Sequence, residues 1–217
     1  MIRLVILDFD GTLADTQTLI INTMQKVIEK LQLPSRSREQ CRAMIGLPLR
    51  QTFSDMIPMT EEMADRCHDT YQEIFFADNR PGVVELFPHV EQTMRALHAA
   101  GIRLAIASSR SRPSLLGFVE QFGMGDIVEM VVSANDVTQH KPHPESIETI
   151  LHSLDVAADE TLMVGDAPYD IIMGVRAGVH TCGVSYGNNT AEELKASGAE
   201  WVVDDFSDVL VKVISLR

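Results

Sequence analysis

The stretch from Leu4 to Thr12 constrains the fold most, because a short apolar run there ends in two carboxylates and a glycine. An apolar run of this length without polar alternation is typical of a strand buried on both faces, as in a parallel sheet. Residues two apart on an extended chain point the same way, so Asp8 and Asp10 are predicted to face one pocket at the strand's carboxyl end. Two carboxylates there repel each other and lose hydration, which favours a divalent cation with oxygen ligands. An ordinary Asp-Gly turn with a solvated neighbour is the alternative.

The next part of the chain has helical patterns only. No strand pattern is found between Gly11 and about Asp78, and Pro81 and Gly82 lie in a predicted linker that follows. A long helical stretch after a single strand indicates an insertion, so we expect a helical cap over residues 15–81 and a core made of residues 1–14 and 82–217. Four cap helices are predicted: one over about 15–31, one from Ser37 ending near Gly46, one opened by Pro48 and one after Thr60.

From Pro88 onward, predicted strands and helices alternate. Single helices between strands indicate right-handed crossovers and a mostly parallel sheet. The predicted fold class is therefore α/β, a Rossmann-like, mostly parallel sheet flanked by helices, with an inserted α-helical cap domain. The strands are predicted at residues 102–107, 130–133, 161–164, 180–184 and 201–203.

Polar side chains follow several of the predicted strands. Asp8 and Asp10 follow the first strand, Ser108 and Ser109 the second, and Asp166 a later one. The carboxyl ends of parallel strands meet at one edge of the sheet, so these side chains are expected to converge on one site.

The residue types at this edge suit phosphoryl chemistry with a metal. Asp8, Asp166 and a backbone carbonyl near Asp10 can supply oxygen ligands to a divalent cation. Lys141, in the run His-Lys-Pro, can balance the carboxylates and hold a phosphoryl oxygen, and Ser108 can donate to another. One carboxylate can act as a nucleophile and form an acyl phosphate, while the second transfers protons. The pattern does not assign which carboxylate has which role.

Each of these residues also has an ordinary structural interpretation. Ser108 can simply end a strand, Lys141 can be a surface lysine, and Asp166 can cap the next helix. His140 and His143 flank Lys141, but no further histidine has ligand spacing and Mg²⁺ prefers oxygen. A histidine metal site is therefore not predicted.

Composition excludes some classes of partner. The formal net charge of -13 argues against a nucleic-acid or anionic-membrane surface, which would need a basic field, but not against a small phosphorylated substrate. No apolar stretch approaches the roughly 18 residues of a membrane span. We therefore expect a cytoplasmic protein, monomer or homodimer. The three widely spaced cysteines fit a reducing compartment: Cys41, Cys67 and Cys182.

Four motifs in order resemble those of the haloacid dehalogenase-like hydrolases. The first is Asp-Phe-Asp-Gly-Thr-Leu-Ala-Asp at 8–15, the second is Ser108, the third is Lys141 with Pro142, and the fourth is Gly-Asp-Ala-Pro-Tyr-Asp at 165–170. The helical insertion between the first two is similar to the cap of the phosphoglycolate phosphatase and β-phosphoglucomutase branch.

The resemblance implies a role for each matching residue. Asp8 would be the nucleophile and Asp10 the general acid and base. Mg²⁺ would be bound by Asp8, Asp166 and the main-chain carbonyl of Asp10, with Asp170 supporting the metal site. Ser108 and Lys141 would position and neutralise the phosphoryl group.

Further residues are predicted to contact the substrate. Gly11, Thr12 and Ser109 adjoin the motif residues, and Arg50 lies in a Gly-Leu-Pro-Leu-Arg segment resembling a cap loop that leans over the active site. Arg50 can meet a substrate carboxylate or second phosphate, or can simply be solvated; Arg110 is a similar candidate.

The expected function is a Mg²⁺-dependent phosphatase that hydrolyses a small, phosphoglycolate-like metabolite through an aspartyl-phosphate. A phosphomutase of the β-phosphoglucomutase type would share the core residues. A non-catalytic phosphate-binding module on the same fold is the third possibility.

Overall fold

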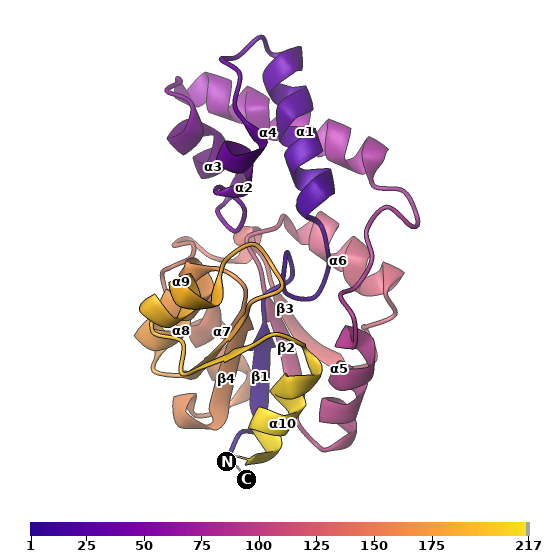
Figure 1. Cartoon of the computed structure of the whole chain (residues 1–217), viewed down its shortest axis with the longest axis vertical. Helices are drawn as coiled ribbons and strands as arrows, with labels where there is room; N and C mark the ends of the chain where they lie inside the picture. The colour runs from indigo at the N-terminus through magenta and orange to yellow at the C-terminus, as the bar shows by residue number, and fades with distance from the viewer. Residues whose placement is uncertain (216–217) are drawn as a thin grey trace.

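A six-stranded parallel sheet forms the centre of the molecule (Figure 1). The computed structural model describes residues 1–215. The strand order is β3-β2-β1-β4-β5-β6, so the chain first builds one half of the sheet and then the other, and β1 lies at the switch point where such sheets bind ligands. The predicted α/β fold is confirmed. The strands are β1 Leu4–Leu7, β2 Arg103–Ala107, β3 Val128–Val132, β4 Thr161–Gly165, β5 His180–Val184 and β6 Trp201–Val203.

Strand β1 is buried on both faces, as its unbroken apolar sequence predicts. None of its four residues has exposed surface. Val5 and Leu7 pack into a core shared with α5, α6 and α10, whereas Leu4 and Ile6 pack against α7 and α8. This alternation fixes the direction of the chain as it leaves the strand. The core helices are α5 Val90–Ala99, α6 Arg112–Gln121, α7 Glu145–Leu154, α8 Pro168–Ala177, α9 Ala191–Ala196 and α10 Ser207–Ser215.

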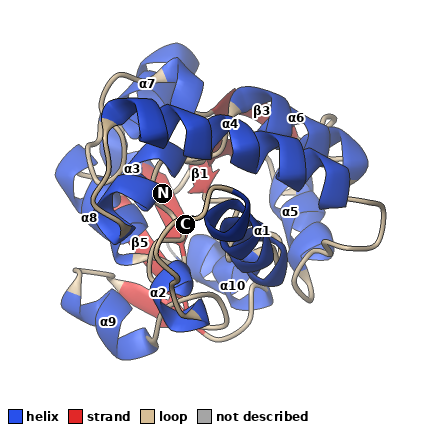
Figure 2. Cartoon of the chain, turned by 90° about the horizontal axis from the view of Figure 1, so that it is seen from above, coloured by secondary structure: helices blue, strands red, loops and turns tan. Residues whose placement is uncertain are grey.

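Four helices lie above the carboxyl ends of the strands and form what we call the cap, residues 15–81 (Figures 1 and 2). That these residues form a separate domain stays a prediction. No helix within residues 1–215 has both the length and the apolar character needed to cross a bilayer. The cap helices are α1 Gln17–Lys30, α2 Arg38–Arg42, α3 Leu49–Met56 and α4 Glu61–Asp78.

Helix α2 begins as predicted but ends earlier. The Ser37 hydroxyl accepts a hydrogen bond from the Gln40 amide at 3.2 Å, and the Gln40 side chain accepts one from the Ser37 amide at 2.9 Å. This reciprocal pair starts the helix. The helix ends at Arg42, and turns continue to Gly46, whose φ of +99° is left-handed. These turns carry the chain down towards the core.

Candidate active site

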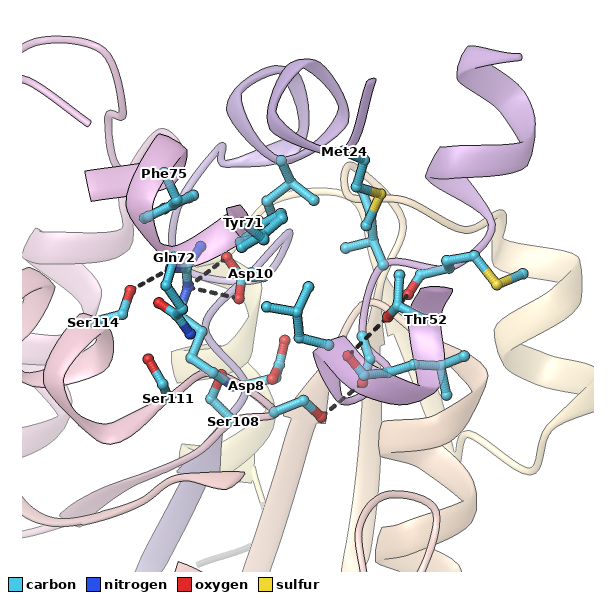
Figure 3. Close-up of a pocket in the computed structure, with 18 residues that line it drawn as sticks. Asp8, Asp10, Met24, Thr52, Tyr71, Gln72, Phe75, Ser108, Ser111 and Ser114 are labelled. Carbon is cyan, nitrogen blue, oxygen red and sulfur yellow. Dashed lines mark hydrogen bonds and ion pairs between the residues drawn. The ribbon is translucent and has the colours of Figure 1, made fainter. Parts of the chain in front are cut away.

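Residues at the ends of β1 and β2 meet beneath the cap. Asp8, Asp10 and Ser108 form the floor of a cavity of about 70 Å³, and residues of α1, α3 and α4 form its roof (Figure 3). Asp166 follows the neighbouring strand β4. The convergence predicted from polar strand ends is therefore present, and the small volume admits only a small group between cap and carboxylates.

Three buried carboxylates form a cluster with one lysine. Asp8, Asp166 and Asp170 are each at most 5% exposed, and one oxygen from each lies within 4.8 Å of the others. Lys141 Nζ donates to Asp8 Oδ1 at 2.5 Å and to Asp170 Oδ1 at 2.6 Å. One ammonium cannot neutralise three carboxylates, so the ionised cluster carries excess negative charge.

Burial, and after it the neighbouring charges, shift the pKa values of these groups. Burial raises the pKa of Asp8 well above its usual value, against the opposing effect of Lys141. Burial, together with the charge of Asp170, raises the pKa of Asp166 to about 7. Burial disfavours the charged form of Lys141, yet the Asp170 and Asp8 carboxylates raise its pKa above the usual value. Hard oxygen donors with uncompensated charge fit a divalent cation, which Asp8, Asp166 and Asp170 would hold.

Asn188 holds Asp166 and was missed by the sequence analysis. Asp166 Oδ2 accepts hydrogen bonds from the Asn188 backbone amide at 2.7 Å and from its Nδ2 at 2.8 Å. Thr12 Oγ1 lies 3.3 Å from the other oxygen, Oδ1. Asn188 belongs to no motif. Its place after β5 makes it a candidate for the polar edge of the sheet, but its contact with Asp166 depends on β5 lying beside β4.

Asp10 lies apart from the three-carboxylate cluster. Its carboxylate accepts a hydrogen bond from Thr16 Oγ1 at 2.6 Å and pairs with Arg110 Nε at 2.8 Å. The predicted contribution of its main-chain carbonyl to a metal stays a prediction. Asp10 nevertheless lines the same cavity as Asp8.

Two aromatic rings and a serine hydroxyl surround the Arg110 guanidinium. Its guanidinium lies 4.6 Å from the ring of Phe75 in α4 and 4.8 Å from that of Phe118 in α6, and Nη1 donates to Ser114 Oγ at 2.6 Å. The sequence predicts that Arg110 contacts the substrate. In the structure Arg110 lines the cavity, and its guanidinium is paired with Asp10.

The remaining predicted substrate residues lie at different places. Ser109 Oγ donates to the Gly46 carbonyl at 2.7 Å, which joins core to cap. Gly11, with φ of +83°, passes so close to Asp166 that an added Cβ would lie 2.2 Å from Oδ2. Arg50 is on α3, half exposed, and pairs with Glu61 and Asp65 outside the cavity.

Comparison with known proteins identifies the family. The sequence pattern of the haloacid dehalogenase-like hydrolases matches residues 5–184, which include all four motifs. The chain belongs to the haloacid dehalogenase-like hydrolases. The family expected from the motifs is therefore confirmed.

Relatives match this haloacid dehalogenase-like hydrolase over nearly its full length. A Dickeya dadantii protein named probable phosphatase IndB is 34% identical, covering 95% of this chain and 91% of its own. A Vibrio parahaemolyticus phosphoglycolate phosphatase is 28% identical, and the match covers 96% of this chain and 95% of the relative. A crystal structure described as a haloacid dehalogenase-like hydrolase from Bacteroides fragilis superposes with a TM-score of 0.90 at 26% identity. The superposition covers 96% of this chain and 100% of that chain.

Proposed function

We propose that this hydrolase is a Mg²⁺-dependent phosphatase that acts on a small phosphorylated metabolite through an aspartyl-phosphate on Asp8. The observation that supports this most is the buried cluster of three carboxylates and one lysine beside Asp10. Such a cluster suits a cation and a phosphoryl group together, because each compensates the charge of the other. Relatives named as phosphatases support the same reaction class.

The reaction has two halves. In the first, an Asp8 carboxylate oxygen attacks phosphorus, the bond from phosphorus to the leaving oxygen breaks, and Asp10 gives that oxygen a proton. In the second, Asp10 takes a proton from a water molecule that attacks the acyl phosphate. Phosphorus then separates from Asp8, which releases inorganic phosphate, restores the Asp8 carboxylate and leaves Asp10 protonated as at the start.

The surrounding residues hold these groups in place. Lys141 pairs with Asp8 and Asp170, and in the proposed reaction its ammonium would meet a phosphoryl oxygen. Ser108 offers its hydroxyl from the cavity floor. Asp8, Asp166 and Asp170 would hold Mg²⁺, which would supply positive charge to stabilise the phosphoryl oxygens.

Cap movement is part of the proposal, because the cavity is small and roofed by cap helices. An opened cap would admit the ester, and a closed cap would exclude bulk water from the acyl phosphate. Phosphoglycolate, named by the Vibrio relative, is the first natural ester to assay. A phosphomutase shares these core residues and differs in whether water reaches the intermediate.

The test is hydrolysis of p-nitrophenyl phosphate with Mg²⁺ and with a chelator. We expect activity only with Mg²⁺, and a loss of at least about 10³-fold in kcat for Asp8→Asn. Asp69→Asn, on the exposed face of α4, is the matched control and should retain activity. Absence of hydrolysis in every condition would favour the phosphate-binding module. A coupled hexose-phosphate isomerisation assay detects the mutase.

A further inference from the structure

The roof of the active-site cavity is mostly apolar. Side chains from the cap that line it include Ile20 and Met24 of α1, Leu49 of α3 and Phe75 of α4 (Figure 3). The roof faces the part of the substrate beyond the phosphoryl group, since the carboxylates that handle phosphorus form the floor. An apolar roof stabilises carbon-bound surface and disfavours an unpaired charge.

The cavity offers no spare positive charge on this side. Among the described residues that line it, Arg110 is the one with a cationic side chain. Its pairing with Asp10 at 2.8 Å neutralises it, and Phe75 and Phe118 cover its faces. An anionic leaving group would have to compete with Asp10, the proposed proton donor, for this arginine.

Arg50 does not supply the missing charge either. It lines an outer cleft, where its Nη2 lies 3.1 Å from Glu61 Oε2 and 2.8 Å from Asp65 Oδ1. Two carboxylates against one guanidinium leave this part of the cleft net negative. An anion at the cap side would therefore meet repulsion rather than a partner.

Two neutral polar side chains on the cap side can recognise a leaving group. Gln72 and Tyr71 of α4 line the cavity, and within residues 1–215 neither side chain has a hydrogen-bond partner. Figure 3 labels both on the cap side. Burial raises the pKa of Tyr71 above its usual value, so the phenol stays neutral. Amide and hydroxyl groups pair with alcohol groups without requiring charge.

We propose that the leaving group is an uncharged, hydroxyl-bearing alcohol, such as a polyol or a neutral sugar, recognised by Gln72 and Tyr71 beneath the apolar roof. The inference rests on the proposed phosphatase function. It replaces the carboxylate-bearing substrate expected from the resemblance with a phosphate monoester of an uncharged alcohol. Burying the unpaired carboxylate of a substrate in this site costs binding free energy. The enzyme should therefore discriminate measurably between uncharged and carboxylate-bearing leaving groups.

The test compares two esters of nearly equal size, 2-hydroxyethyl phosphate and 2-phosphoglycolate, with the full-length enzyme and Mg²⁺. They differ only in a hydroxymethyl group against a carboxylate. We expect kcat/KM to favour 2-hydroxyethyl phosphate by about tenfold or more. A smaller ratio, or one in favour of phosphoglycolate, overturns the inference. If turnover is too slow, the ratio of inhibition constants against p-nitrophenyl phosphate provides the same comparison.

Variants of Gln72 and Arg50 identify the residues responsible. Gln72→Leu should raise KM for 2-hydroxyethyl phosphate about fivefold or more with a smaller change in kcat, and Gln72→Arg should shift the ratio towards phosphoglycolate. Arg50→Gln should leave the ratio within about twofold; a selective loss of phosphoglycolate turnover would show that Arg50 reaches the substrate and would contradict the inference.

The two proposals fail in different ways. Without hydrolysis of p-nitrophenyl phosphate, the phosphatase function fails and the leaving-group inference with it. With p-nitrophenyl phosphate hydrolysed and the ratio below tenfold, only the leaving-group inference fails.

Discussion

Arg110 Nε lies 2.8 Å from Asp10 Oδ2, and the two side chains are only 8% and 12% exposed. The arginine follows β2 and the aspartate follows β1, so the pair joins two strand ends. Contact of the guanidinium with Phe75 extends the link to cap helix α4. Asp10 is therefore held by a residue that also contacts the cap.

Replacing Arg110 should destabilise the protein, because the Asp10 side chain, only 12% exposed, would keep its hydrogen bond from Thr16 but lose its ionic partner. We expect Arg110→Ala to lower the free energy of unfolding by about 3 kcal/mol in urea titrations. Arg112→Ala is the matched control, since Arg112 is nearly half exposed and should change stability by at most about 0.5 kcal/mol.

A double-mutant cycle separates the pair from simple loss of packing. Combining Arg110→Ala with Asp10→Asn should destabilise less than the sum of the single changes, by about 1 kcal/mol or more. Strict additivity would show that the two side chains do not stabilise each other.

Lys141 should be required for turnover rather than only for folding. Its ammonium contacts both Asp8, which lines the cavity, and Asp170, and its side chain is only 5% exposed. We expect Lys141→Ala to lower kcat on p-nitrophenyl phosphate by about 10² to 10³-fold. Lys195→Ala, at an exposed position of α9, should keep full activity. Near-normal kcat in Lys141→Ala would remove the lysine from the proposed chemistry.

Adding a side chain at Gly11 should disturb the residues around Asp166 as well as strain the backbone. Gly11 and Gly82 have φ of +83° and +82°, but an added Cβ meets Asp166 and Asn188 at Gly11 and nothing within 4 Å at Gly82. Both alanine variants should lose about 1 kcal/mol from the backbone angle. Only Gly11→Ala should also weaken Mg²⁺ binding, by about tenfold in calorimetry. Equal Mg²⁺ affinities would mean that the close approach has no effect on the site.

Stabilisation by Mg²⁺ should grow with pH. The pKa of Asp166 is about 7 in the folded protein against an ordinary value of 3.8. The metal-free folded state therefore keeps a proton that the unfolded chain releases, so this group's contribution to stability is lost as pH rises between those values. At low pH, Mg²⁺ must displace the Asp166 proton in order to bind. At high pH the Asp166 carboxylate is already ionised.

The rise in Tm on adding Mg²⁺ should accordingly be larger at about pH 8 than at about pH 5.5. Asp166→Asn should reduce both the rise and its pH dependence. A Tm increase that is independent of pH would contradict the assignment of Asp166 to the cation site.

The sheet and its polar edge could be predicted from the sequence because local patterns determine them. The apolar run before Asp8 requires a strand buried on both faces, and β1 has no exposed residue. Strand β3 was expected from Met130 but starts at Val128, where its register with β2 shifts between Leu104 and Ala105. Such a shift depends on the neighbouring strand and leaves no local signal.

The contacts of Arg110 and Asn188 could not be predicted in the same way. Arg110 follows a motif serine, which made a substrate contact plausible, but its pairing with Asp10 depends on Phe75 and Phe118 from separate helices. Asn188 reaches Asp166 because β5 lies next to β4, which only the strand order determines. Both are consequences of tertiary structure.

Chemical trapping of the phosphorylated nucleophile tests most directly whether Asp8 forms an aspartyl-phosphate. Wild-type enzyme turning over p-nitrophenyl phosphate with Mg²⁺ would be quenched with borohydride, which reduces an acyl phosphate to an alcohol, and the N-terminal peptide would be sequenced by mass spectrometry. We expect homoserine at position 8, dependent on substrate and absent from Asp8→Asn. Turnover with an unmodified Asp8, or with the reduction at Asp10 instead, would contradict it.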